Sequence, residues 1–357
     1  MDRNEIIDWL TEENPERLTR LWARADRVRR RHVGDEVHLR GLVEVSSHCV
    51  RRCAYCGLSA ENRELSRYRM TAEEVLASAH DAVRYGYGTV VLQAGEDPEL
   101  TGKWVAELVR RIKAETPLAI TLSLGERSDD ELAVWRQAGA DRYLLRFETS
   151  DPVLYARVHP PRPGTRSDRI AILRTLRRLG YEVGSGVMIG IPGQTYGSLA
   201  DDVMLFSELD PDMIGVGPFI PHPGTPLGQT QEQLGADQAP NTELMTYKVV
   251  ALARLICPNA NIPSTTALAT LNPHRGRELG LKRGANVVMP NVTPTRYRRL
   301  YEIYPAKACI AETASQCHLC LEGRIASLGR TIGVGRGDSR RYHEMVKARS
   351  GGPGVVR

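Results

Sequence analysis

The sequence predicts an α/β fold: a complete (β/α)8 barrel of the TIM type, with a helical extension before it and a second extension after it. Between residues 41 and 300, eight short apolar runs rich in β-branched residues alternate with amphipathic helix patterns. Eight strands that are each followed by a helix produce the parallel, right-handed arrangement of this barrel. A chain of 357 residues is long enough for the barrel and both extensions.

The predicted elements alternate along the chain. Strands are expected at 42–46, 88–93, 118–123, 142–147, 183–189, 212–217, 261–266 and 285–289. Helices are expected near 71–85, 100–115, 128–138, 168–179, 195–208 and 241–256, with shorter ones near 275–282 and 296–303. Thr71 and Ser128 precede acidic residues as N-caps, and Gly139 and Gly180 stand where helices are expected to end.

These elements divide the chain into three segments. Residues 1–40 are expected to be an N-terminal helical extension, residues 41–304 the barrel, and residues 305–357 a C-terminal extension. The stretch 350–354 is rich in glycine and is expected to be disordered.

Composition excludes several classes of protein. No run approaches the roughly 18 apolar residues of a membrane span, and the first residues lack the apolar region of a secretory signal. The arginine-rich stretch 27–31 and the tail from Arg324 onward contain few aromatic residues, which argues against nucleic-acid binding. Six of seven cysteines lie in two tight triplets, which favours metal ligation in a reducing cytoplasm over disulfides. The seventh, Cys257, is expected to be an inert buried thiol.

The first triplet, Cys49, Cys53 and Cys56, has the spacing Cys-x3-Cys-x2-Cys and directly follows the first predicted strand. An iron–sulfur cube has four irons, so three thiolates leave one iron without a protein ligand. A small molecule can chelate the metal at that vacancy and accept an electron. The alternatives are a zinc site completed by a distant residue, or three unrelated buried cysteines.

Active sites in such barrels lie at the C-terminal ends of the strands. Several of the predicted strands end on or near polar residues, namely Gln93, Glu96, Ser123, Arg146, Glu148, Thr265 and Thr266. Gly95 and Glu96 suit an ammonium group, although a turn with a solvated acid is the plainer explanation. Arg146 and Glu148 alternate with apolar neighbours and share one face, either as ligand contacts or as a structural ion pair.

Other residues near the predicted mouth have chemistry suited to ligands. Arg169, at the start of a helix, presents a planar fork that fits a carboxylate, and the two threonine hydroxyls at 265–266 suit a small anion. His222 is either a ligand-facing group or a capped loop histidine. Tyr301 and Tyr304 are three apart and are expected on one helix face, as a lid or as ordinary packing.

The cysteine triplet and its position after a first strand resemble the radical S-adenosylmethionine (SAM) superfamily. The resemblance narrows to the HydE-type [FeFe]-hydrogenase maturases and covers roughly residues 40–320. It is carried by the stretches 68–71, 91–98, 140–149, 191–195, 217–227, 261–267 and 284–291. Biotin synthase and methylornithine synthase share the fold and the triplet. Phe147 stands where a histidine is common in the family, which puts an imidazole role there in doubt.

The resemblance implies a barrel that encloses a large cavity, with a [4Fe–4S] cluster on the first triplet and S-adenosyl-L-methionine bound beside it. It implies SAM contacts at Tyr55, Gln93, Gly95, Glu96, Glu148, Arg169, Met213, Tyr301 and Tyr304. It implies substrate or anion positions at Ser123, Arg146, Thr265 and Thr266.

The implied activity is reductive cleavage of SAM to a 5′-deoxyadenosyl radical that acts on an organometallic Fe(CO)2(CN)–cysteine substrate in H-cluster maturation. Other hydrogenase maturases and a low-potential electron donor are the expected partners, and the protein is expected to be a cytoplasmic monomer. The alternatives are a HydE-like paralogue that acts on an amino acid or thiazolidine, and a non-catalytic iron–sulfur scaffold.

The second triplet, Cys309, Cys317 and Cys320, again offers three sulfurs, with His318 as a candidate fourth ligand. By resemblance it holds an auxiliary [2Fe–2S] or [4Fe–4S] cluster. The alternative is an adventitious or vestigial site, and no catalytic role is expected.

Overall fold

A computed structural model describes residues 1–162, 167–230 and 235–344, and its strands form a barrel. Seven parallel strands follow one another in the order β6-β5-β4-β3-β2-β1-β7, and β8 pairs with β1. Their bounds are β1 (Glu36–Ser46), β2 (Thr89–Ala94), β3 (Ala119–Ser123), β4 (Arg142–Leu144), β5 (Glu182–Ile189), β6 (Met213–Pro218), β7 (Val287–Val288) and β8 (Thr331–Ile332). The predicted α/β barrel class is confirmed.

The strand expected at 261–266 is reduced to isolated bridges. Asn261 bridges Met213 in β6, and Pro263 bridges Val287 in β7, so backbone pairing still closes the circuit between these two strands. A proline cannot donate to a ladder, which interrupts regular pairing at this point. The first helix after it already begins at Thr266.

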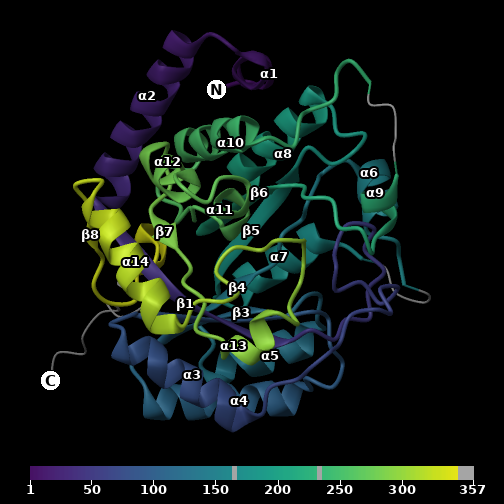
Figure 1. The fold of residues 1–357 in the computed structure, drawn as a ribbon, viewed down its shortest axis with the longest axis vertical. Helices are drawn as coiled ribbons and strands as arrows, with labels where there is room; N and C mark the ends of the chain where they lie inside the picture. Colours follow the sequence, from purple (N-terminus) through teal and green to yellow (C-terminus); the bar gives the residue numbers. More distant parts are fainter. Residues whose placement is uncertain (163–166, 231–234, 345–357) are drawn as a thin grey trace, which may run out of the picture.

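Helices surround these strands (Figure 1). Their bounds are α1 (Arg3–Thr11), α2 (Pro15–Val33), α3 (Ala72–Arg84), α4 (Gly102–Glu115), α5 (Asp129–Ala138), α6 (Pro152–Val158), α7 (Arg169–Arg178), α8 (Tyr196–Leu209), α9 (Pro226–Gln229), α10 (Glu243–Ile256), α11 (Thr266–Leu271), α12 (Gly276–Lys282), α13 (Thr295–Arg298) and α14 (Ala314–Ala326). Thr71 and Ser128 form the predicted capping boxes, and Gly139 ends α5 in the left-handed conformation.

The helix expected at 296–303 is wrong beyond residue 298. Helix α13 covers only Thr295–Arg298, so Tyr301 and Tyr304 do not share a helix face. The following chain is held instead by partners distant in sequence. The amide of Gly57, for example, donates to the carbonyl of Ile303 at 3.0 Å.

Both extensions pack on the barrel. Helix α1 packs against α8 and α2 against α10. The end of the described chain reaches the N-terminal ends of the strands, where the carbonyl of Arg336 accepts from Arg142 at 2.9 Å. There the buried Arg142 of β4 donates to Glu182 at 2.7 Å and also pairs with Asp338. No helix within the described residues has the length and apolar character to cross a membrane. The disorder expected at 350–354 lies outside the described residues.

Candidate functional site

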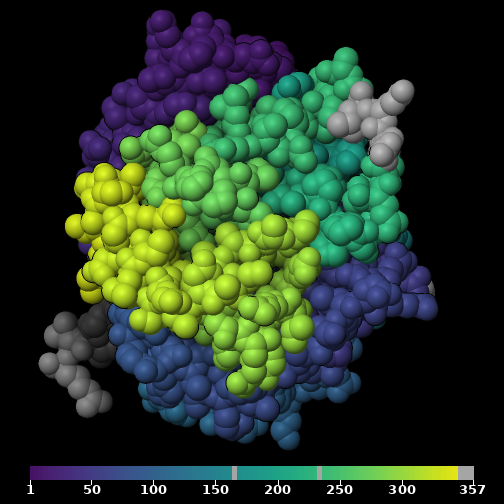
Figure 2. Space-filling model, in the orientation of Figure 1, coloured from purple at the N-terminus to yellow at the C-terminus, as the bar shows by residue number. Residues whose placement is uncertain are grey.

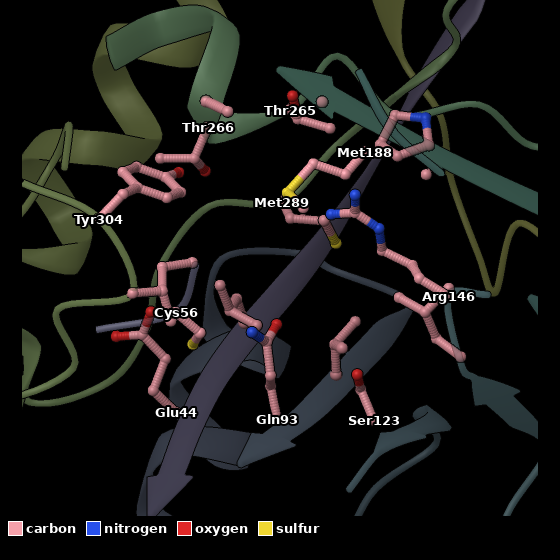
Figure 3. A pocket seen from close by; sticks show the side chains of 18 of the residues that line it. Glu44, Cys56, Gln93, Ser123, Arg146, Met188, Thr265, Thr266, Met289 and Tyr304 are labelled. Carbon is pink, nitrogen blue, oxygen red and sulfur yellow. The ribbon is translucent and has the colours of Figure 1, made fainter. Parts of the chain in front are cut away.

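A cavity of about 350 Å³ opens among the C-terminal ends of the strands. Figure 3 shows side chains from several elements pointing into it, including Cys56, Gln93, Arg146 and Tyr304. It collects every predicted site residue of the barrel: Cys49, Cys53, Tyr55, Cys56, Gln93, Gly95, Glu96, Ser123, Arg146, Glu148, Arg169, Met213, Thr265, Thr266, Tyr301 and Tyr304. Of the second triplet, Cys309 lines the cavity and the other two cysteines do not.

The loop that carries the first triplet is shaped by backbone contacts. The side chain of Arg67 donates to four carbonyls of this loop region, including that of Ser47 at 2.6 Å and that of Ser59 at 2.7 Å. A Cβ at Gly95 would lie 2.3 Å from the carbonyl oxygen of His48 and 2.7 Å from the Cβ of Cys49. Glycine is therefore required where β2 ends against the loop.

Burial raises the pKa of all three thiols, so their ionised form is unfavourable without a neighbouring positive charge. Burial, followed by the neighbouring thiols, raises the pKa of Cys53, and burial raises the pKa of Cys56 to about 12. Bound iron would supply the charge that keeps these groups as thiolates. The amide of Glu96 donates to the Cys49 sulfur at 3.4 Å, a contact of the kind that tunes iron–sulfur clusters.

Among the residues that the structure describes, no group of three or more His, Cys, Asp or Glu side chains is placed to hold one metal ion.

Glu96 lines the cavity, but its carboxylate is already engaged. Arg51 contacts Glu96 and Glu126, each at 2.5 Å, and the amide of Glu126 donates to the other oxygen of Glu96 at 3.0 Å. Arg169 joins the network through Glu126 at 2.9 Å. Both oxygens of Glu96 therefore already accept a hydrogen bond, and each oxygen has a second lone pair that a ligand can use. The sequence analysis missed Arg51 and Glu126 of this network: Arg51 lies between Cys49 and Cys53, and Glu126 follows the third strand.

Glu148 has the strained backbone typical of functional positions. Its φ is 66°, in the left-handed region that residues other than glycine seldom adopt. The strand β4 ends at Leu144, so Arg146 and Glu148 are not strand neighbours on one face as expected, yet both line the cavity. The hydroxyl of Tyr55 donates to one oxygen of Glu148 at 3.2 Å.

The second oxygen of Glu148 lies 2.9 Å from the guanidinium of Arg146 without hydrogen-bond alignment. Within the described residues it accepts no hydrogen bond, and buried Arg146 Nε and Thr265 Oγ1 are also without partners. Buried polar atoms without partners are costly, so the position of Arg146 Nε and Thr265 Oγ1 beside one cavity indicates a polar ligand.

Two other sequence expectations have clear outcomes. His222 is buried and does not line the cavity. Its Nδ1 accepts from the amide of Gly224 at 3.0 Å, so its ring is bound within its own loop instead of facing a ligand. Tyr301 is buried, and this burial raises the pKa of its hydroxyl well above the usual range although Gln93 opposes the rise. Glu44 and Lys307 also line the cavity, and the sequence analysis had missed both.

The second triplet is only partly gathered. Cys317, followed by Arg277, lowers the pKa of Cys309 to about 6, and the guanidinium of Arg277 donates to the Cys309 sulfur at 3.6 Å. Cys320 is exposed on α14, where Arg324 Nε donates to its sulfur at 3.3 Å. The ring of His318 is held by the hydroxyl of Tyr87 at 3.2 Å.

Comparisons with known proteins agree with this geometry. Residues 43–206 match the model of the Radical SAM superfamily. The chain is 46% identical over 326 residues to the [FeFe] hydrogenase maturase subunit HydE of Thermotoga maritima, covering 91% of this chain and 90% of that protein. It is 32% identical over 295 residues to 3-methylornithine synthase of Methanosarcina barkeri, covering 82% and 79%.

Solved structures show the same fold. The crystal structure of methylornithine synthase (PylB) superposes with a TM-score of 0.78 at 27% identity, covering 93% of this chain and 94% of that chain. The FeFe-hydrogenase maturase HydG from Carboxydothermus hydrogenoformans superposes with a TM-score of 0.70 at 21% identity, covering 82% and 67%. At that identity the second likeness concerns the fold alone.

Proposed function

Because this chain belongs to the HydE family of radical SAM enzymes, we propose that it acts in the maturation of [FeFe]-hydrogenase. The observation that carries the proposal is one cavity that joins three cysteines to the polar residues expected to hold SAM. When bound, a reduced [4Fe–4S] cluster gives an electron to SAM, whose cleavage yields a 5′-deoxyadenosyl radical.

We assign the cluster to Cys49, Cys53 and Cys56. The SAM-binding set is Tyr55, Gln93, Gly95, Glu96, Glu148, Arg169, Met213, Tyr301 and Tyr304, and Glu96 also holds Arg51. Glu148, Arg169, Met213 and Tyr301 are buried, which limits the access of water and protects a reactive primary carbon radical from side reactions.

We assign the substrate to the part of the cavity lined by Ser123, Arg146, Thr265 and Thr266. The free donor atoms of Arg146 and Thr265 support an anionic or strongly polar group there. By family likeness the substrate is the Fe(CO)2(CN)–cysteine species. A HydE-like paralogue with an amino-acid or thiazolidine substrate would use the same donors. We propose a cytoplasmic monomer that works with a low-potential electron donor and other maturases.

The test is anaerobic reconstitution with iron and sulfide, followed by dithionite and SAM, with 5′-deoxyadenosine as the readout. Cys53→Ser is expected to lose bound iron and SAM cleavage together. Cys257→Ser is the matched control, because Cys257 is also buried but its sulfur contacts the carbonyl of Phe206, outside the cavity lining. Reductive cleavage that survives Cys53→Ser would refute the assignment.

The same preparation separates the alternatives. An iron–sulfur scaffold without catalysis would bind no SAM in equilibrium dialysis. Candidate substrates added to the reduced enzyme distinguish the maturase from a paralogue, since only the true substrate increases the yield of 5′-deoxyadenosine and is itself consumed.

A further inference from the structure

The segment 299–308, which we call the strap, lines one side of the cavity without regular secondary structure. Five of its residues line the cavity, namely Tyr301, Ile303, Tyr304, Lys307 and Ala308. In Figure 2 the yellow-green chain of this region forms the outer surface in the middle of the view. A coil has no internal ladder of hydrogen bonds, so its position depends on contacts with the barrel.

Lys307 is the charged anchor of the strap. Its ammonium is buried, lies 2.6 Å from Oε1 of Glu44 in β1, and donates to the carbonyl oxygen of Tyr301 at 2.9 Å. It also lies 5.1 Å from the centre of the Tyr301 ring. The other oxygen of Glu44 accepts from Asn291 at 3.0 Å, so the carboxylate is fixed on the barrel side.

These contacts hold Tyr301 at two points. Lys307 donates to its backbone carbonyl and lies over its ring, which faces the cavity together with Gln93 at the end of β2. The backbone next to Lys307 is strained, since Ala306 has a φ of 52°. A strained coil keeps one conformation only when its surroundings over-determine it, and the ammonium supplies that constraint.

A simpler explanation is that Lys307 only neutralises Glu44. A buried ion pair can often be replaced by uncharged side chains at little cost, because both ions lose hydration. Neutralising Glu44 does not require the hydrogen bond that Lys307 also donates to the carbonyl of Tyr301. This bond connects Lys307 to a residue of the strap that faces the cavity. The two explanations therefore predict different behaviour when the pair is removed as a unit.

We propose that Lys307 is a positioning residue that holds Tyr301 over the cavity and thereby sets the affinity of the enzyme for SAM. This inference rests on the proposed function of the cavity. Loss of the ammonium leaves the carbonyl of Tyr301 without its donor and lets the strap move, so that the ring and hydroxyl of Tyr301 no longer stand ready for the ligand. The cluster loop has its own anchors and is expected to keep its iron.

The test measures the Kd of SAM by equilibrium dialysis on reconstituted protein of matched iron content. Lys307→Met is expected to weaken binding roughly tenfold or more, since a hydrogen bond from a charged donor is lost. Lys307→Arg retains a cationic donor and is expected to stay within about threefold of wild type. Lys248→Met is the matched control, because Lys248 is a buried lysine that donates to the carbonyl of Leu10 at 2.8 Å, outside the cavity lining.

The double variant Glu44→Gln/Lys307→Met decides between the two explanations. It removes both charges, so wild-type affinity in this variant would show that the pair only neutralises itself and would overturn the proposal. Wild-type affinity in Lys307→Met would overturn it as well. In the double variant we expect an affinity for SAM as weak as that of Lys307→Met alone. If Lys307→Met does not fold, Lys307→Gln takes its place under the same criteria.

A second readout uses protein without cluster or SAM. Hydrogen exchange of the backbone amides in 299–308 is expected to be faster in Lys307→Met than in wild type, and unchanged in Lys248→Met. Equal exchange in Lys307→Met and wild type would overturn the anchoring role. If wild-type protein binds no SAM at all, the proposed function fails, while the exchange measurement still tests the strap.

Discussion

Asp202 of helix α8 offers a sharp prediction about pH and stability. Its carboxylate is fully buried, and one oxygen accepts from the amide of Ser150 at 2.5 Å and from the hydroxyl of Thr149 at 3.3 Å. The other oxygen accepts from the side chain of Gln194 at 3.1 Å. The carboxylate thus ties the chain just after Glu148 to the loop after β5. Burial raises the pKa of Asp202 to about 7, although these hydrogen bonds oppose the rise.

The perturbation is Asp202→Asn, which keeps the size of the side chain and removes the proton equilibrium. In the folded protein the Asp202 carboxyl stays protonated up to about pH 7, whereas in the unfolded chain it loses its proton near its usual pKa of 3.8. Between these values the folded state binds more protons than the unfolded state, so raising the pH lowers the free energy of unfolding. The interval corresponds to ~4 kcal/mol at ~1.4 kcal/mol for each pH unit.

The assay is urea unfolding of cluster-free protein at a series of pH values from about 4 to 8. The difference in unfolding free energy, wild type minus Asp202→Asn, is expected to fall by ~4 kcal/mol across this range and to level off above about pH 7. Asp8→Asn, at an exposed residue of α1, is the control and should show no such fall. A difference that stays constant with pH would refute the argument that burial governs this carboxylate.

Three further outcomes are expected. Gly95→Ala places a Cβ 2.7 Å from the Cβ of Cys49 and should lower the iron bound after reconstitution. Gly323→Ala should leave the bound iron unchanged, because a Cβ there meets nothing within 4 Å. Equal iron in the Gly95 and Gly323 variants would contradict the steric explanation. Glu148→Gln should weaken SAM binding roughly tenfold in dialysis while the cluster absorbance stays unchanged. Arg142→Met leaves buried carboxylates unpaired and should lower the free energy of unfolding by ~3 kcal/mol in urea titrations, whereas unchanged stability would contradict a structural role.

Local sequence patterns were sufficient for the class of fold and for several of the residues that line the cavity. Hydrophobic periodicity and caps such as Thr71 predicted most of the barrel helices, because these signals act within a few residues. Parallel strands end at the same edge of a barrel, so residues far apart in the chain, such as Gln93 and Thr265, were expected in one cavity before any contact was known.

The partners within that cavity were decided by the tertiary structure. Arg51 meets Glu96 across 45 residues, and Lys307 meets Glu44 across 263 residues. No local pattern encodes which of several cations a buried carboxylate will contact. The ion pair between Glu96 and Arg51 could therefore be found only in the structure.

By itself, the sequence determined a radical SAM barrel, a three-cysteine loop after the first strand and the polar set at the strand ends. Only the tertiary structure decided that Glu148 adopts a left-handed backbone, that the strap is a coil instead of a helix, and that the chain around Asp338 packs at the opposite end of the barrel. The reason is physical: periodicity reports which face of an element is buried, while strain, charge pairing and coil position follow from surfaces that meet only when the barrel closes.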